Sequence, residues 1–143
     1  MHGEVQKPGL GPLHTEFDEK GNAYTSFFVS SEVVKWNVQS LKVLDRIATY
    51  YSVGHLSVPG GPTKKPHGKY LIAYNKITKD RYLPTGPELA QSAQLYDISG
   101  EKMKLLLDFP TIGEPHLSLI HISEHTRLLS ISYAVFCLKK KKQ

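Results

Sequence analysis

The sequence predicts an all-β fold made of antiparallel hairpins. Short runs of β-branched and aromatic residues follow one another along most of the 143-residue chain. Clusters of glycine, proline, asparagine and serine separate these runs, and such clusters favour tight turns. The hairpins recur without a fixed period, so the pattern by itself predicts antiparallel β structure and no particular architecture. With 40% hydrophobic residues, a chain of this length is typical of one globular domain.

The first expected hairpin consists of strands at residues 23–29 and 33–38. Gly21-Asn22 supplies a left-handed turn before the first strand, and residues 30–32 turn the chain between the two strands. Tight turns of this kind suit an antiparallel pair. Trp36, in the second strand, is interpreted as a residue that packs between sheets rather than one that stacks on a ligand.

A short amphipathic helix is expected next, at residues 39–51. Its apolar residues recur at intervals of three and four, which is the helical period. They are Leu41, Leu44, Ile47, Ala48 and Tyr51. This helix would lead into a turn at Gly54-His55.

The second half of the chain is expected to return to hairpins. Residues 58–66 are too rich in proline and glycine for regular structure, and His67 falls in the tight surface turn that follows. Residues 70–75 form the next expected strand, and residues 76–87 are expected to be loop. Strands at 94–98 and 103–107 then pair around the turn at 99–102.

The net charge is concentrated at the C-terminus. A formal charge of +5 and an isoelectric point near 9.2 would ordinarily indicate a nucleic-acid or membrane-surface partner. Residues 117–143 carry most of it, because Arg127 and Lys139 to Lys142 outnumber Glu124. The basic cluster at 76–81 is interrupted by an aspartate and lacks an aromatic platform, so a solvated loop is expected there and no nucleic-acid partner.

Neither a membrane span nor a secretory signal is evident. No apolar stretch is long enough to cross a bilayer. The first residues lack the basic and then apolar layout of a signal peptide, so Met1 is expected to be an internal methionine of a longer protein.

Three histidines follow turn residues, which makes them candidate metal ligands. His14 follows Gly-Pro-Leu, His55 follows glycine and His116 follows proline. Histidines on separate turns can converge on one metal ion. They are 41 and 61 residues apart, which is no short-range metal motif, and imidazole suits several transition metals. From the pattern alone, loop histidines with local hydrogen bonds remain the ordinary interpretation.

Three long blocks resemble the catalytic domain of nitrous oxide reductases. They are GLGPLHTEFDEKGNAYTSFFVSSEVVKWNV (residues 9–38), YLIAYNKITKDRYLPTGP (70–87) and QLYDISGEKMKLLLDFPTIGEPH (94–116). The resemblance runs from about Lys7 to His116 in the family's order. It implies that residues 1–116 are a fragment of a seven-bladed β-propeller, holding about two to three blades. Open sheet edges would remain, because so few blades do not close a ring.

The resemblance also implies a copper site. In this family, seven histidines hold a four-copper sulfide cluster at the propeller axis, and His14, His55 and His116 match three of them. Reduction of nitrous oxide to dinitrogen and water, the last step of denitrification, takes two electrons and two protons. Copper ions that share a soft sulfide suit this poor ligand, and neutral imidazoles hold them without adding charge. The two-copper electron-entry site belongs to a domain absent from this chain.

Two further residues match catalytic positions of the family. Lys76 corresponds to a lysine near the cluster, where an ammonium group stabilises oxide charge or relays protons, and Glu114 corresponds to its acidic neighbour. The family also uses the carbonyl of this lysine for a calcium ion, so the resemblance implies a calcium site at Lys76 and Gln91. The family's acidic calcium partner is replaced here by Gln91, which leaves that site open, and Glu88 would substitute only if the loop shifted.

The resemblance places the longer enzyme in the periplasm as a homodimer. Its substrate would be nitrous oxide, and a cytochrome c or another donor would reduce the missing domain. The fragment alone is expected to be inactive. The alternative is a non-catalytic β-propeller module that binds a protein or small ligand and whose histidines are incidental.

Residues 117–143 are expected to form no domain. LSLIHISE and the following TR resemble a translated transposase adapter, ISYAVFCL resembles the adjoining flow-cell sequence, and the lysine run matches poly-A read-through. The tail contains the only cysteine, Cys137, together with His121 and His125, whose helical spacing is then an accident. The rival interpretation is an apolar strand pair that ends in a polybasic lipid anchor.

Overall fold

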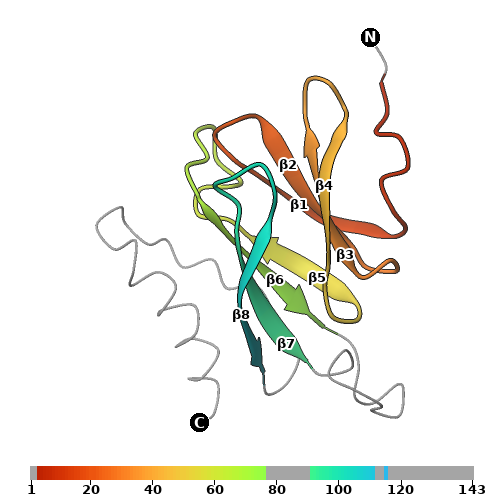
Figure 1. The fold of residues 1–143 in the computed structure, drawn as a ribbon, viewed down its shortest axis with the longest axis vertical. Coiled ribbons are helices and arrows are strands. Elements are labelled where there is room, and N and C mark those ends of the chain that lie inside the picture. The colour runs from red at the N-terminus through yellow and green to blue at the C-terminus, as the bar shows by residue number, and fades with distance from the viewer. Residues whose placement is uncertain (1–2, 77–90, 112–114, 116–143) are drawn as a thin grey trace.

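The computed structural model describes residues 3–76, 91–111 and residue 115, and these residues form eight β-strands (Figure 1). The strands are β1 (Pro12–Phe17), β2 (Asn22–Phe27), β3 (Glu32–Asn37), β4 (Val43–Ala48), β5 (Val53–Ser57), β6 (Tyr70–Asn75), β7 (Ser92–Asp97) and β8 (Lys104–Pro110). The predicted all-β fold is therefore confirmed.

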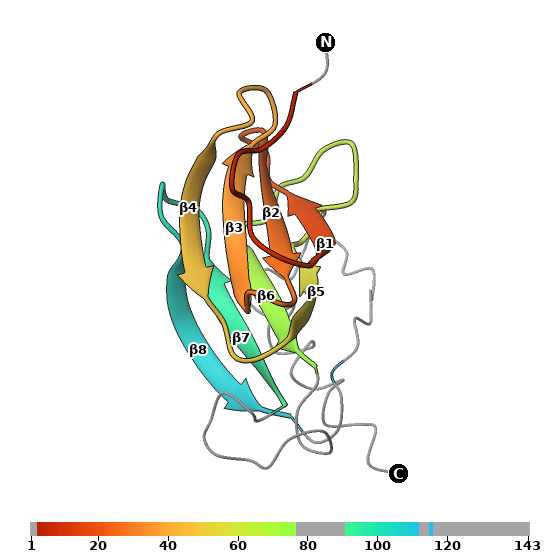
Figure 2. The same ribbon diagram turned by 90° about the vertical axis from the view of Figure 1, so that its right-hand side faces the viewer.

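The strands form two four-stranded antiparallel sheets. Their orders are β1-β2-β3-β4 and β5-β6-β7-β8, so each sheet is a simple meander. The sheets lie side by side, with β1 and β5 at one edge of the pair and β4 and β8 at the other (Figure 2). This is the arrangement of two neighbouring propeller blades with their first strands innermost.

The apolar core fills the space between the two sheets. Side chains alternate between the faces of a strand, so one face of β2 and β3 meets the second sheet. The buried core residues are Tyr24, Val33, Val53, Leu56, Val58, Leu71, Ala73, Tyr96, Ile98 and Met103, with Ile47 packed against them. Trp36 lies on the opposite face, next to Thr25, where its indole N–H donates to the Thr25 hydroxyl at 3.0 Å. It therefore does not pack between these two sheets.

The helix expected at residues 39–51 is wrong. Asn37 ends β3, and its side-chain oxygen accepts hydrogen bonds from the N–H groups of Gln39 and Ser40. This turn reverses the chain, and β4 then pairs antiparallel with β3. Half-buried and exposed residues alternate along β4, which is the period of a strand. The free edge of β3 offers a full ladder of hydrogen bonds, and that tertiary pairing overrides a brief helical spacing.

The two histidine turns are also corrected. His14 lies within β1 and His55 lies within β5. Neither strand was expected, because glycine and proline interrupt both sequences. The hairpins at 23–38 and 94–107, the strand at 70–75 and the irregular loop at 58–66 are confirmed. Residues 77–87 of the expected loop, Glu88, Glu114, His116 and the tail 117–143 lie outside the described residues.

Polar contacts link the two sheets at the turn between β7 and β8. Lys35, which is buried, donates from Nζ to the carbonyl oxygens of Gly100 and Glu101 at 2.8 and 3.0 Å. The Met103 N–H donates to the Asp45 carboxylate at 2.6 Å. Side chains of the first sheet thus form hydrogen bonds with both ends of the turn between β7 and β8.

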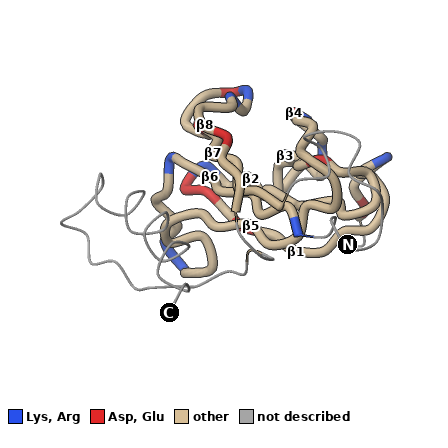
Figure 3. The backbone as a smooth tube through the Cα atoms, turned by 90° about the horizontal axis from the view of Figure 1, so that it is seen from below, with Lys and Arg blue, Asp and Glu red and all other residues tan. Residues whose placement is uncertain are grey.

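Basic and acidic positions are scattered over the described residues of both sheets (Figure 3). Within the same part of the chain, no helix is long and apolar enough to cross a membrane.

Candidate functional site

A β-bulge positions His14 on the first innermost strand. Pro12 pairs with Phe27 and His14 pairs with Ser26, so Leu13 is an extra residue in β1. A bulge bends its strand and redirects the neighbouring side chains. The short Gly-Pro-Leu sequence before His14 therefore produces this irregularity instead of a free turn.

A second bulge positions His55 on the other innermost strand. Val53 pairs with Asn75 and Leu56 pairs with Ala73, so Gly54 and His55 together lie opposite one residue of β6. Both candidate ligands thus lie at an irregular point of the strand nearest the inner edge of its blade. Irregularities of this kind are frequent beside active sites.

The two histidines are in contact. Their ring centroids are 5.3 Å apart, and the rings meet edge to face at 69°. The Leu56 N–H donates to His14 Nδ1 at 3.0 Å. Because Nδ1 accepts this hydrogen bond, a neutral His14 ring carries its proton on Nε2.

Ser26 connects the strands that carry the histidines. Its side chain is fully buried, and Oγ donates to the Gly54 carbonyl at 2.6 Å. The His14 N–H donates to the same Oγ at 3.2 Å. Sequence analysis missed Ser26, because a single serine within a strand has no pattern that distinguishes it from its neighbours.

Lys76 completes the cluster from the end of β6. Its N–H donates to the Ser52 carbonyl at 3.0 Å, and the residue is only 9% exposed. The aliphatic part of its side chain lies over Gly54, so a Cβ at that position would overlap Cγ, Cδ and Cε of Lys76. The glycine before His55 therefore leaves room for the lysine side chain that crosses it, and a larger residue there would make that side chain move.

Burial lowers the pKa of His14, and repulsion from the Lys76 ammonium lowers it further. Both effects favour the neutral imidazole, which is the form that binds metal ions. Beside it, burial raises the pKa of Glu16 to about 7. Glu16 Oε1 lies 3.8 Å from His14 Nε2, and Oε2 is buried without a hydrogen-bond partner. Sequence analysis missed Glu16, although its position two residues after His14 in a strand places both side chains on one face.

The donor types fit copper, but the described residues form only part of a site. No group of three or more histidine, cysteine, aspartate or glutamate residues within them could hold a metal ion. Two imidazoles, His14 and His55, come together there, and a metal ion on His14 would displace either the proton on Nε2 or the Leu56 hydrogen bond. His116 and Glu114 fall outside the described residues.

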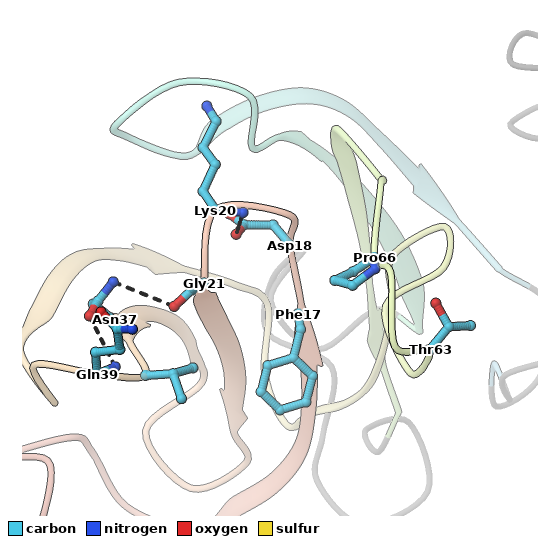
Figure 4. A pocket seen from close by; sticks show the side chains of 9 residues that line it. Phe17, Asp18, Lys20, Gly21, Asn37, Gln39, Thr63 and Pro66 are labelled. Carbon is cyan, nitrogen blue, oxygen red and sulfur yellow. Dashed lines mark hydrogen bonds between the residues drawn. The ribbon is translucent and has the colours of Figure 1, made fainter.

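A surface pocket lies elsewhere among the described residues. Its volume is about 450 Å³, and it is formed by the turns after β1 and β3 together with the loop at 58–69 (Figure 4). Asp18 lines it, but this carboxylate already accepts hydrogen bonds from the N–H groups of Lys20 and Asn22, the Asn22 amide and the Tyr24 hydroxyl. His67 is exposed, as expected, and its Nδ1 lies 3.5 Å from the Lys65 carbonyl.

Comparison with known proteins identifies the family. Residues 46–116 match the family model described as the nitrous oxide reductase propeller repeat. The nitrous-oxide reductase of Stutzerimonas stutzeri is 45% identical over 118 residues, which cover 76% of this chain and 18% of that protein. The nitrous-oxide reductase of Cupriavidus necator is 44% identical over 130 residues, which cover 83% of this chain and 20% of that protein.

The nitrous-oxide reductase of Ralstonia nicotianae gives the same result, with 44% identity over 119 residues. The chain spans about a fifth of the length of the curated relatives that it matches. The two adjacent four-stranded sheets agree with a repeat of propeller blades. The chain therefore belongs to the nitrous oxide reductase family, of whose propeller it is a fragment.

Proposed function

We propose that this segment belongs to a copper enzyme that reduces nitrous oxide to dinitrogen and water. His14, His55 and His116 would be three of the histidine ligands of its four-copper sulfide cluster. The observation that carries the proposal is the contact between His14 and His55, whose rings lie 5.3 Å apart although 40 residues separate them in the chain between β1 and β5. The family resemblance implies both residues as ligands independently of this contact.

The chain's own residues prepare neutral nitrogen donors. Burial favours the uncharged His14 ring, and the two bulges place both imidazoles at the inner edge of adjacent blades. Ser26 and the Leu56 N–H fix the backbone and the ring orientation between these blades. When bound, sulfide-bridged copper ions would supply the two electrons that the reduction requires.

Lys76 is proposed to act beside the cluster rather than in it. Its side chain crosses Gly54 and raises the positive potential at His14. An ammonium group in this position would stabilise negative charge that develops on the departing oxygen, or donate a proton to it. Glu114 is proposed as its acidic neighbour.

The longer enzyme would supply the remaining parts. These include the other histidine ligands and the two-copper domain that accepts electrons from a cytochrome c or a similar donor. A periplasmic homodimer is proposed for it by the same family resemblance. The chain alone would be inactive, and residues 117–143 would add no function.

The test uses the full-length enzyme of Stutzerimonas stutzeri with residues 7–116 of this chain in place of its matched segment. His14→Ala, His55→Ala and His116→Ala should each remove most cluster copper and reduce turnover by about 100-fold or more, since loss of even an outer partner of a metal ligand costs about 10–100-fold. Lys76→Ala should retain copper while turnover falls about 100-fold or more. His67→Ala is the control, because His67 is exposed on a surface turn.

Copper analysis and turnover measured on the same samples separate the roles. Full copper loading and activity in the His14 or His55 variant would contradict the ligand assignment. Absence of both copper and turnover in the unsubstituted graft would favour the alternative, a propeller module that binds a partner and does not catalyse.

A further inference from the structure

The main chain of Lys76 is fixed by a carboxamide. Gln91 Nε2 donates a hydrogen bond to the Lys76 carbonyl oxygen at 3.3 Å. Lys76 directly follows β6 and Gln91 directly precedes β7, so this bond closes the two strands beyond their last ladder pair, Asn75 with Ser92. The Gln91 carbonyl in turn accepts the N–H of Thr111 at 2.8 Å, which ties it to the end of β8.

Neighbouring amides extend this arrangement into the blade. Asn75 is fully buried, and its Nδ2 donates to Ser92 Oγ at 2.9 Å and to Gln94 Oε1 at 3.2 Å. Gln94 Oε1 also accepts the Tyr50 N–H at 3.1 Å. The peptide units on both sides of Lys76 are therefore held, because Ser52 accepts its N–H and Gln91 donates to its carbonyl.

This geometry does not fit a calcium ion on the Lys76 carbonyl. Calcium requires several oxygen donors, including carboxylates that balance its charge. Here an amide N–H faces the carbonyl oxygen, and a neutral glutamine adds no negative charge. Among the described residues there is also no group of three acidic or histidine side chains that could complete such a site.

We propose that Gln91 is a positioning residue that holds the Lys76 carbonyl in place of a cation. By fixing that carbonyl, it directs the Lys76 side chain across Gly54 toward His14 and His55. Any effect of this positioning on the turnover of nitrous oxide rests on the proposed function. The calcium independence and the seating of the side chain do not, because they concern contacts present without copper or substrate.

The test uses the full chain without copper, in EDTA and in 5 mM calcium chloride. Nuclear Overhauser effects between the Lys76 side-chain methylenes and the Gly54 α protons report whether the lysine is seated, and thermal unfolding reports calcium binding. In the unsubstituted chain, the Overhauser effects should be present and the Tm should be the same in both buffers.

Three variants separate the hydrogen bond from simple packing. Gln91→Met keeps the length of the side chain but has no amide, and it should lose the Overhauser effects in both buffers. Gln91→Glu should lose them in both buffers, because two oxygens repel each other and one carboxylate with one carbonyl does not complete a calcium site. Gln39→Glu adds the same charge at an exposed turn and should show no calcium response.

Two results would overturn the proposal. A calcium-dependent rise in Tm of the unsubstituted chain would show that the cation site is intact. Unchanged Overhauser effects in the Gln91→Met chain would show that Gln91 does not seat Lys76. Neither readout depends on turnover, so both are independent of whether the enzyme function is correct.

Discussion

Single atoms determine how the histidines lie, and those atoms belong mainly to the backbone. The Leu56 N–H orients the His14 ring, and the Gly54 carbonyl is held by Ser26. The absence of a side chain at Gly54 leaves room for the stem of Lys76. At this scale the Gly-His sequence has a steric explanation, since Gly54 leaves room for the side chain of Lys76, which is distant in the chain.

At the residue scale, Asp18 allows a test of how low pH affects the stability of the fold. Burial by itself would raise the pKa of Asp18, but hydrogen bonds from Asn22, Tyr24 and Lys20 outweigh it and lower the pKa below 3.8. The contribution of the Asp18 carboxylate to folding stability is therefore fully present above pH 3.8. It is lost as the pH falls through the lowered pKa of Asp18 in the folded state. Asp18→Asn should reduce the free energy of unfolding by about 2–3 kcal/mol at pH 7, with a smaller difference near pH 2.

Urea unfolding at pH 7, 4 and 2 checks this expectation. Glu19→Gln, an exposed neighbour in the same turn, is the control and should change stability by less than about 0.5 kcal/mol. A loss in Asp18→Asn that is equally large at every pH would contradict the electrostatic explanation.

Among the elements, hairpins closed by recognisable turns could be predicted from the sequence. Residues 23–38 and 94–107 have glycine, serine or asparagine at each reversal, and both hairpins are present. β1 and β5 were missed because bulges break their alternation, and β4 was mistaken for a helix because its spacing allowed either period. These three strands are fixed by pairing with other strands, and a single sequence does not record that pairing.

Lys35 provides the element-scale prediction, because it joins β3 of the first blade to the turn between β7 and β8. Replacing it with methionine keeps an apolar stem but removes Nζ, which lies 5.8 Å from the centroid of the Tyr24 ring. The Gly100 and Glu101 carbonyls would lose their donor. We expect Lys35→Met to lower the free energy of unfolding by about 1–3 kcal/mol.

Amide hydrogen exchange would locate that effect. Exchange at residues 99–103 should accelerate more than exchange in β2, because the contact lies between the blades. Lys42→Met, at an exposed position in the turn before β4, is the matched control. Uniform acceleration over both sheets would indicate a general loss of stability instead of a released turn.

At the scale of the whole molecule, the candidate site combines segments that only the stacking of blades brings together. His14 and Lys76 could be selected by resemblance because each lies in a block that matches the family, and His55 was matched by its Gly-His sequence and its distance of 61 residues from His116. Ser26 and Glu16 carry no family match: Ser26 acts through a contact between blades, and Glu16 lies beside His14 on the same strand. Gln91 was named by the resemblance only as a calcium position, and its hydrogen bond to the Lys76 carbonyl is visible only in the structure. The contribution of His116 stays a prediction, as it lies outside the described residues.

Two blades also limit what the isolated chain can assemble. His14 and His55 are the two imidazoles that meet among the described residues, and His116 would bring the total to three of the seven ligands that the family resemblance implies. A site that lacks most of its ligands loses both affinity and geometry. We therefore expect the 143-residue chain, incubated anaerobically with cuprous copper and sulfide, to show no cluster absorption and no reduction of nitrous oxide.

The grafted full-length enzyme, reconstituted in parallel, is the positive control for that experiment. Copper that binds weakly to the isolated chain should decrease when His14 is replaced by alanine, because it would rest on the His14–His55 pair. Copper binding that is indifferent to this substitution would place the metal elsewhere on the chain. Cluster absorption with turnover from the isolated chain would contradict the view that two blades are too few, because the missing ligands would then be dispensable.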